Sequence, residues 1–327
     1  MSESNNQPVL RIRDLVVEFK TEMGTIRALD KISFEVMAGE SLGIVGESGC
    51  GKSVTALSIL KLIPSPPGRI AEGSIELDGI EVVSQPEHEM RKVRGALASM
   101  IFQEPMTALN PVFTIGNQMV EVIRVHQKVK KAEAKKQAID MLRTVNIESP
   151  EKRIDQYPHE LSGGMRQRVM IAMALSCSPK LLIADEPTTA LDVTVQAQVM
   201  EEIKRLQQER NMGLILITHD LGVIAESCSR VVVMYCGKII EMATTGELYQ
   251  NPRHPYTRGL LDSIPRVRKE KLKSLPTIKG MVPDLADVPK GCRFADRCPK
   301  VEDRCRSEEP PLEDTEGGGK VACFNPN

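Results

Sequence analysis

Short apolar runs and segments of helical periodicity alternate along most of the chain. Two runs rich in Val, Ile and Phe, at 9–19 and 26–37, show partial alternation and predict strands. A third run, at 41–45, leads through a Gly-rich turn into a helical segment at 52–62. Residues 114–146 carry apolar side chains at helical spacing, which predicts helices there.

From residue 164 the alternation becomes regular. Its predicted elements are a helix at 164–177, a strand at 180–184, a helix at 193–210, a strand at 213–218, a further helix and a strand at 230–235. This order predicts a buried parallel sheet with crossover helices, hence an α/β fold. Between 250 and 290, Pro, Lys and Arg accumulate, which predicts a linker to a Cys-bearing tail.

Charge and hydropathy argue against several classes of protein: general nucleic-acid binders, membrane-spanning proteins and secreted proteins. The chain has 43 Lys and Arg against 44 Asp and Glu, so a general nucleic-acid binder with a basic surplus is disfavoured. The basic excess at 128–153 lacks interleaved aromatics and is typical of a solvated helix surface. The uncharged stretch 105–120 contains two Pro residues, so no membrane-spanning helix is expected. The first residues lack a secretory pattern, and we expect a cytosolic protein.

The strongest motif is GESGCGKS, at 46–53, between a predicted strand and a predicted helix. It fits the P-loop pattern, in which backbone N–H groups face a polyphosphate, the Lys reaches the outer phosphates and the Ser hydroxyl binds Mg²⁺. The predicted nucleotide-binding residues of this segment are Gly46, Glu47, Ser48, Gly49, Cys50, Gly51, Lys52, Ser53 and Val54.

The segment LLIADE, at 181–186, predicts an apolar strand that ends in two carboxylates. The carboxyl edge of a parallel sheet is where ligands of α/β folds bind. Asp185 is the candidate for holding Mg²⁺, through water, and Glu186 is suited to orient or deprotonate a water that attacks the γ-phosphate.

A second anion site is predicted from LSGGMRQR, at 161–168. Ser162, Gly163 and Gly164 stand at a predicted helix start, where N–H groups and the helix dipole favour a phosphate. With one P-loop Lys and one magnesium carboxylate, the chain carries half of each of two sites. We therefore expect it to act as a dimer.

These residues resemble the ATP-binding cassette (ABC) family over about 9–250. GESGCGKS resembles Walker A, LLIADEP Walker B, and LSGGM the signature, with Met165 where Gln is commonest. The resemblance implies that Gln103 senses the γ-phosphate, joins Ser53 and Asp185 around Mg²⁺ and contacts the transmembrane partner. It also implies that His219 is the switch histidine and that Ala190, Leu191 and Asp192 form the D-loop. Phe19 stacks on adenine or belongs to the sheet core.

Two further stretches, at 251–265 and from 291, resemble the ATPase subunits of bacterial oligopeptide, dipeptide and nickel importers. This resemblance implies a P-loop fold with a parallel core, an antiparallel β subdomain and a helical subdomain at about 104–178, all within a nucleotide-binding domain at 1–255, and an extension at 256–327. It implies ATP as substrate, a heterodimer with a second ATPase, two transmembrane permease subunits, a periplasmic solute-binding protein and a place on the cytoplasmic face of the bacterial inner membrane.

Two alternative functions remain for an ATPase of this family, and they differ in what ATP hydrolysis would move. A nickel or other small-solute importer is one, because solute recognition belongs to other chains. A soluble ABC ATPase that acts on nucleic acid in DNA repair or in translation is another. The DNA-repair proteins of this kind need a long coiled-coil insertion between the Walker motifs, and the translation proteins usually carry two cassettes. The sequence contains neither feature.

Four of the eight Cys, Cys292, Cys298, Cys305 and Cys323, lie in the tail. The tail has few large apolar residues and is expected to need a staple, which in a reducing compartment favours a metal over disulfides. The wide spacing favours a [4Fe-4S] cluster over zinc, with free thiols or an oxidation-dependent link as a third possibility. The resembling importer subunits carry a similar four-Cys tail, and an iron-sulfur cluster is attributed to some of them.

Overall fold

The computed structural model describes residues 7–22, 24–103, 108–188, 193–264 and 277–327. The chain divides into two compact units. The first unit comprises Met1–Leu10, Glu35–Glu40 and Glu76–Leu216, and the second unit comprises Arg11–Phe34, Ser41–Ile75 and Ile217–Asn327. Each unit is therefore assembled from segments far apart in the sequence.

The first unit holds three buried strands and most of the helices. Its strands β8, β7 and β6 follow one another in that order, and β6 and β7 are parallel. Its elements are β5 (Ile80–Glu81), α2 (Glu87–Val93), β6 (Ala98–Ile101), α4 (Ile115–Gln127), α5 (Lys131–Thr144), α6 (Pro150–Arg153), the 3₁₀ turn η1 (Pro158–Glu160), α7 (Gly163–Leu175), β7 (Leu181–Asp185), α8 (Val193–Glu209) and β8 (Gly213–Ile217).

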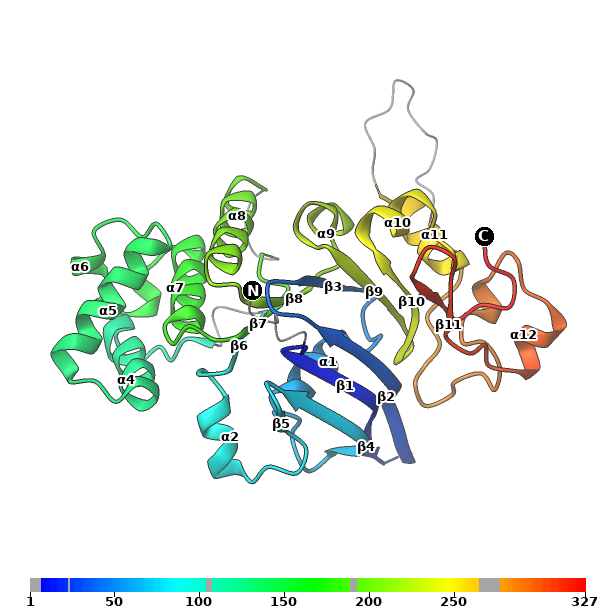
Figure 1. The fold of residues 1–327 in the computed structure, drawn as a ribbon, viewed down its shortest axis with the longest axis horizontal. Helices are drawn as coiled ribbons and strands as arrows, with labels where there is room; N and C mark the ends of the chain where they lie inside the picture. The colour runs from blue at the N-terminus through cyan, green and yellow to red at the C-terminus, as the bar shows by residue number, and fades with distance from the viewer. Residues whose placement is uncertain (1–6, 23, 104–107, 189–192, 265–276) are drawn as a thin grey trace, which may run out of the picture. The chain divides into compact units, whose positions relative to one another are not determined.

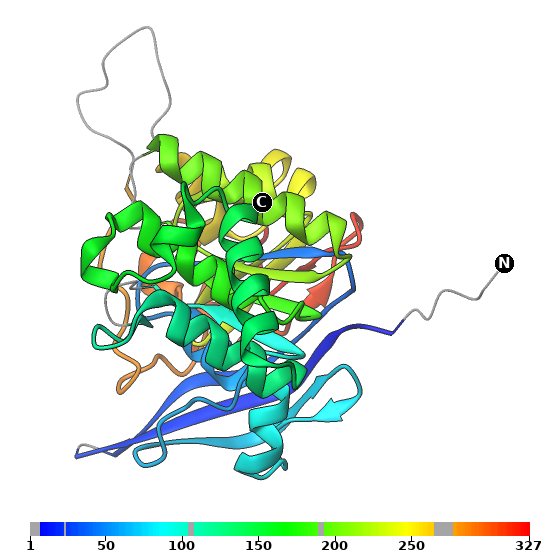
Figure 2. The ribbon, with the colours of Figure 1, turned by 90° about the vertical axis from the view of Figure 1, so that its left-hand side faces the viewer.

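Helices α4, α5 and α7 of the first unit pack side by side (Figure 1). Figure 2 views these helices from their own side. The facing side chains are apolar at helical spacing, as with Ala134, Ala138 and Leu142 of α5, which are fully buried. This confirms the helices predicted within 114–146.

The second unit contains a mixed sheet. Strands β11, β12, β10, β9 and β3 follow one another in that order, with β3 parallel to β9 and the remaining pairs antiparallel. A second sheet has the order β2, β1, β4. The elements are β1 (Leu10–Thr21), β2 (Gly24–Val36), β3 (Ser41–Val45), α1 (Lys52–Ile59), β4 (Gly68–Leu77), α9 (Leu221–Ser227), β9 (Arg230–Tyr235), β10 (Lys238–Thr244), α10 (Thr245–Gln250), α11 (Pro255–Asp262), η2 (Ala295–Arg297), α12 (Asp303–Ser307), β11 (Glu313–Asp314) and β12 (Lys320–Val321).

The continuous apolar runs are the most deeply buried strands. Every residue of β7 and β8 is buried, as are four of the five residues of β3. Parallel strands covered on both faces require such sequences, because neither face meets water. The strands expected from these runs are confirmed, and the structure adds β4, β5, antiparallel β10 and the short C-terminal strands β11 and β12.

Candidate functional site

The loop between β3 and α1 is shaped by its glycines. Gly46, Gly49 and Gly51 have φ angles of 151°, 79° and 104°, in or near the left-handed region that other residues avoid. A Cβ at Gly46 would overlap the backbone oxygen of Met234 in β9. Gly51 caps α1 without a side-chain hydrogen bond, so the first N–H groups of α1 stay available to an anion. The loop therefore fits a polyphosphate.

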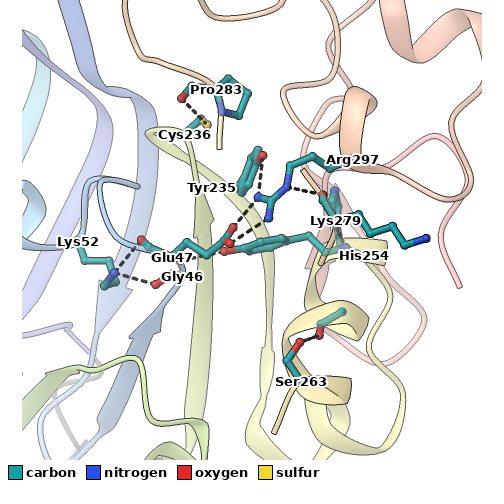
Figure 3. Close-up of polar contacts among 12 residues, drawn as sticks. Gly46, Glu47, Lys52, Tyr235, Cys236, His254, Ser263, Lys279, Pro283 and Arg297 are labelled. Atoms are coloured by element: carbon teal, nitrogen blue, oxygen red, sulfur yellow. Dashed lines mark hydrogen bonds and ion pairs between the residues drawn. The ribbon is translucent and has the colours of Figure 1, made fainter. Parts of the chain in front are cut away.

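Lys52 lies folded along this loop. Its side chain is 7% exposed, and Nζ donates to the carbonyl oxygens of Gly46 at 2.7 Å and of Glu47 at 3.0 Å (Figure 3). These are weak neutral acceptors for an ammonium, which can exchange them for phosphate oxygens. Next to it, Ser53 is exposed, whereas Cys50 is fully buried, and burial raises the pKa of its thiol. Cys50 is thus a packing residue of the loop.

Two other predicted residues lie in the second unit. Phe19, in β1, is half-buried, and its ring lies against the backbone of Gly68, where a Cβ would come within 2.8 Å of it. His219 is exposed and stands two residues after the end of β8, beside Asp220, which caps α9.

In the first unit, the end of β7 brings together two predicted residues. Asp185 is the last, buried residue of β7, and Glu186 follows it with a φ of 46°. Such a left-handed conformation is strained in a non-glycine residue and is common at functional sites. Gln103, 83 residues earlier, donates from Nε2 to Oε2 of Glu186 at 3.0 Å. Gln103 and Glu186 therefore form one cluster.

The predicted signature begins a helix, as expected. α7 starts at Gly163, and Ser162 is its N-cap, whose hydroxyl accepts from the N–H of Met165 at 3.3 Å. No heavy atom lies within 4 Å of where a Cβ of Gly163 would be. The N-terminus of α7 is thus open around Gly163. The D-loop residues Ala190, Leu191 and Asp192 lie outside the described residues.

Some structurally important residues near these motifs were not singled out from the sequence. Gln167, a buried amide on α7, donates to the carbonyl oxygen of Pro187, directly after Glu186. Tyr256 and Arg297 both contact Glu47 of the glycine loop. Gln167 stands between Arg166 and Arg168 in the sequence, so no local signal marks it, and the other two residues lack one as well.

The predicted four-Cys metal site is wrong. Among the described residues, which include Cys292, Cys298, Cys305 and Cys323, no group of three or more His, Cys, Asp or Glu could hold a metal ion. The four thiols are free and line a cavity of only about 10 Å³, together with apolar groups such as Phe294. Burial also raises the pKa of Cys292 and of Cys323, the latter to about 11, and so opposes the thiolate that a metal requires. Neither a [4Fe-4S] cluster nor zinc is supported.

The tail is held by contacts with the rest of the second unit. β12 pairs with β10, so that Val321 lies opposite Glu241. Phe294 is buried, with its ring centre 5.4 Å from that of Tyr235. Arg293 pairs with Asp30. These contacts supply the stabilisation for which a metal was expected.

Comparison with protein families gives two matches. The family described as "ABC transporter" matches residues 29–189, and the family described as "Oligopeptide/dipeptide transporter, C-terminal region" matches residues 240–305. The second match covers part of the tail that holds Tyr256 and Arg297. The first match includes GESGCGKS, LSGGM and LLIADEP, and the second includes the stretch at 251–265 and residues 291–305.

Curated relatives match nearly the whole chain. The chain is 51% identical to the oligopeptide transport ATP-binding protein AppD of Bacillus subtilis, over 97% of this chain and 96% of that protein. It is 49% identical to the dipeptide transport ATP-binding protein DppD of Escherichia coli, over 97% of both. A probable peptide ABC transporter ATP-binding protein of Sinorhizobium fredii is 50% identical over 98% of this chain and 95% of that one.

Among solved structures, the dimeric post-hydrolysis state of the ATP-binding cassette MJ0796 bound to ADP and Pi is similar. Its TM-score is 0.66 at 26% identity, covering 72% of this chain and 98% of that one. None of the helices in the described part of the chain is long and apolar enough to cross a membrane.

Proposed function

Because the chain belongs to the ATP-binding subunits of the peptide ABC transporters, we propose that its glycine loop holds the ATP whose hydrolysis drives peptide import. The curated relatives are named as peptide, oligopeptide and dipeptide transport proteins at 49–51% identity. The chain is thus an ATP-hydrolysing motor subunit. The observation that carries the proposal is the loop itself: glycines at positive φ, a helix start without a side-chain cap, and Lys52 beside it.

The glycine loop at 46–53 binds the triphosphate. Backbone N–H groups at 46–53 and the ammonium of Lys52 donate to phosphate oxygens, and Phe19 stacks on the base. The hydroxyl of Ser53, the carboxylate of Asp185 and the amide oxygen of Gln103 are hard oxygen donors of the kind that Mg²⁺ prefers. When bound, Mg²⁺ neutralises charge on the phosphates and orients them.

Glu186 and Gln103 act on the attacking water. The carboxylate of Glu186 accepts the water's proton, while the bond between water and the γ-phosphorus forms and the bond to the leaving ADP oxygen breaks. The 3.0 Å hydrogen bond from Gln103 orients this carboxylate. His219 donates to the γ-phosphate from the end of its strand. Lys52 and His219 thus supply positive charge or hydrogen bonds to the phosphates, Glu186 accepts the proton, and Gln103 orients Glu186 with its amide nitrogen while its amide oxygen is available to Mg²⁺.

The assembly follows from the half-sites. Ser162, Gly163 and Gly164 contact ATP held by the glycine loop of a second ATPase subunit, and the partner's signature completes the site of this chain. Support comes from the dimeric cassette with a similar fold. The pair binds two permease subunits at the cytoplasmic face of the inner membrane. A periplasmic binding protein delivers the peptide to those permease subunits from the opposite, periplasmic side. We place the nucleotide-binding domain at 1–255, its helical subdomain at 104–178, and the extension at 256–327.

Substitution of the base tests this assignment. In the assembled transporter, Glu186→Gln should lower the ATP turnover rate at least about 100-fold while ATP still binds, because an amide cannot accept the proton. Lys52→Ala should instead weaken ATP binding itself. The matched control is Glu133→Gln, at an exposed carboxylate on α5, which should leave turnover unchanged. A Glu186→Gln transporter that hydrolysed ATP at the wild-type rate would rule out Glu186 as the base.

A further inference from the structure

Residue Glu47 of the glycine loop is held from two directions by the C-terminal part of the second unit. Its backbone N–H donates to the hydroxyl of Tyr256 in α11 at 2.8 Å. Its carboxylate accepts two hydrogen bonds from the guanidinium of Arg297, at 2.6 Å and 3.0 Å (Figure 3). These partners lie 209 and 250 residues further along the chain. The tail is therefore bonded directly to the loop.

Arg297 is built into a buried polar cluster. Its side chain is only 4% exposed. Besides Glu47, it donates from Nε to the carbonyl oxygen of Lys279 at 3.1 Å and from a terminal nitrogen to the hydroxyl of Tyr235 at 3.2 Å. Its guanidinium carbon lies 5.9 Å from the ring centre of Phe294. Two parallel bonds to one carboxylate, with aromatic rings alongside, use the planar fork that distinguishes Arg from Lys.

The other side of Glu47 leads to the Lys that defines the loop. The carbonyl oxygen of Glu47 accepts from Nζ of Lys52 at 3.0 Å. The position of Glu47 therefore bears on the position of Lys52. In addition, Glu47 is a carboxylate within a loop that we assign to a triphosphate, and like charges at short range repel each other. The cation of Arg297 offsets that repulsion.

We propose that Arg297 is a positioning residue for nucleotide binding, which fixes Glu47 and cancels its charge so that the loop accepts the phosphates. This inference rests on the proposed nucleotide site in the glycine loop. Arg297 acts through Glu47 rather than by touching the nucleotide. It makes the tail a determinant of nucleotide affinity.

The proposal predicts a specific pattern of affinities for MgADP and MgATP, measured by calorimetry on the full chain. Arg297→Met should raise both dissociation constants about tenfold, the scale of one lost charge-assisted pair. Arg297→Lys keeps the charge but loses the fork, and should fall between wild type and Arg297→Met. Adding Glu47→Gln to Arg297→Met should restore most of the affinity, because the uncompensated charge is gone. A merely structural defect would not be rescued in this way.

The matched control is Arg304→Met. Arg304 lies in the same tail, pairs with Glu308 at 2.9 Å and has its guanidinium carbon 4.0 Å from the ring centre of Phe324. Its substitution should leave both dissociation constants unchanged. Lys52→Ala separates the two proposals. If Lys52→Ala binds nucleotide as wild type does, the proposed site is wrong. If Lys52→Ala loses binding while Arg297→Met and Arg297→Lys bind normally, or if Glu47→Gln rescues nothing, the role of Arg297 is overturned.

Discussion

A buried His makes the stability of the second unit depend on pH. His254, the N-cap of α11, is 1% exposed, and its Nδ1 accepts from the N–H of Tyr256 at 3.0 Å. Its ring centre lies 5.7 Å from that of Phe294. An accepting Nδ1 carries no proton, so the ring is neutral in the fold. Burial lowers the pKa of His254 from its ordinary 6.5 to about 3.

The sign and size of the effect follow from this shift. Above pH 6.5 the ring is neutral in both the folded and the unfolded chain, and the full contribution to stability is present. As the pH falls, the unfolded chain takes up a proton that the fold refuses, so stability is lost down to about pH 3. Between pH 7 and pH 5 the loss in the free energy of unfolding is about 2 kcal/mol.

Urea unfolding of the full chain at pH 7, 6 and 5 measures this loss. His254→Gln removes the titrating ring, so its stability should fall by about 2 kcal/mol less than that of the wild type over the same range, whatever its stability at pH 7. His88→Gln is the control, because His88 is exposed and should leave the pH dependence unchanged. Equal pH dependence in wild type and His254→Gln would refute the assignment of a neutral buried ring.

Three further outcomes are expected. Gly46→Ala should abolish MgATP binding in calorimetry, because the added methyl overlaps a backbone oxygen of β9 and φ is 151°; normal binding would contradict the loop geometry. Ser162→Ala should lower the free energy of unfolding by about 1 kcal/mol, because the N-cap of α7 is lost, and it should slow ATP turnover of the assembled pair. A wild-type turnover rate would argue against the signature role of Ser162. Arg293→Met should lower the free energy of unfolding in urea by about 2–3 kcal/mol, because it breaks the buried ion pair with Asp30, which keeps only Lys238 at 3.4 Å as a charged partner. An unchanged unfolding midpoint would show that the pair contributes little.

The sequence alone determined the local parts of the machinery. The course of the loop at 46–53 could be predicted from the positive φ of its glycines and a helix that starts at Lys52, and both are properties of neighbouring residues. Ser162 likewise caps α7 through a bond to a residue three positions away. The buried strands β7 and β8 followed from their continuous apolar runs. These features involve short-range contacts, so a short window of sequence is sufficient to predict them.

Tertiary structure decided the rest, because it depends on which distant groups are buried together. The spacing of the tail Cys residues suggested a metal, yet their thiols share a small, largely apolar cavity, and burial opposes the charged thiolate. Arg297 stands in the same tail with no local pattern that marks it, and its contact with Glu47 closes a loop of 250 residues. Such a long-range ion pair stabilises the fold only when the surrounding rings and carbonyl groups bury and hold the guanidinium, because its free energy must exceed the entropy lost in ordering the two side chains and closing the loop.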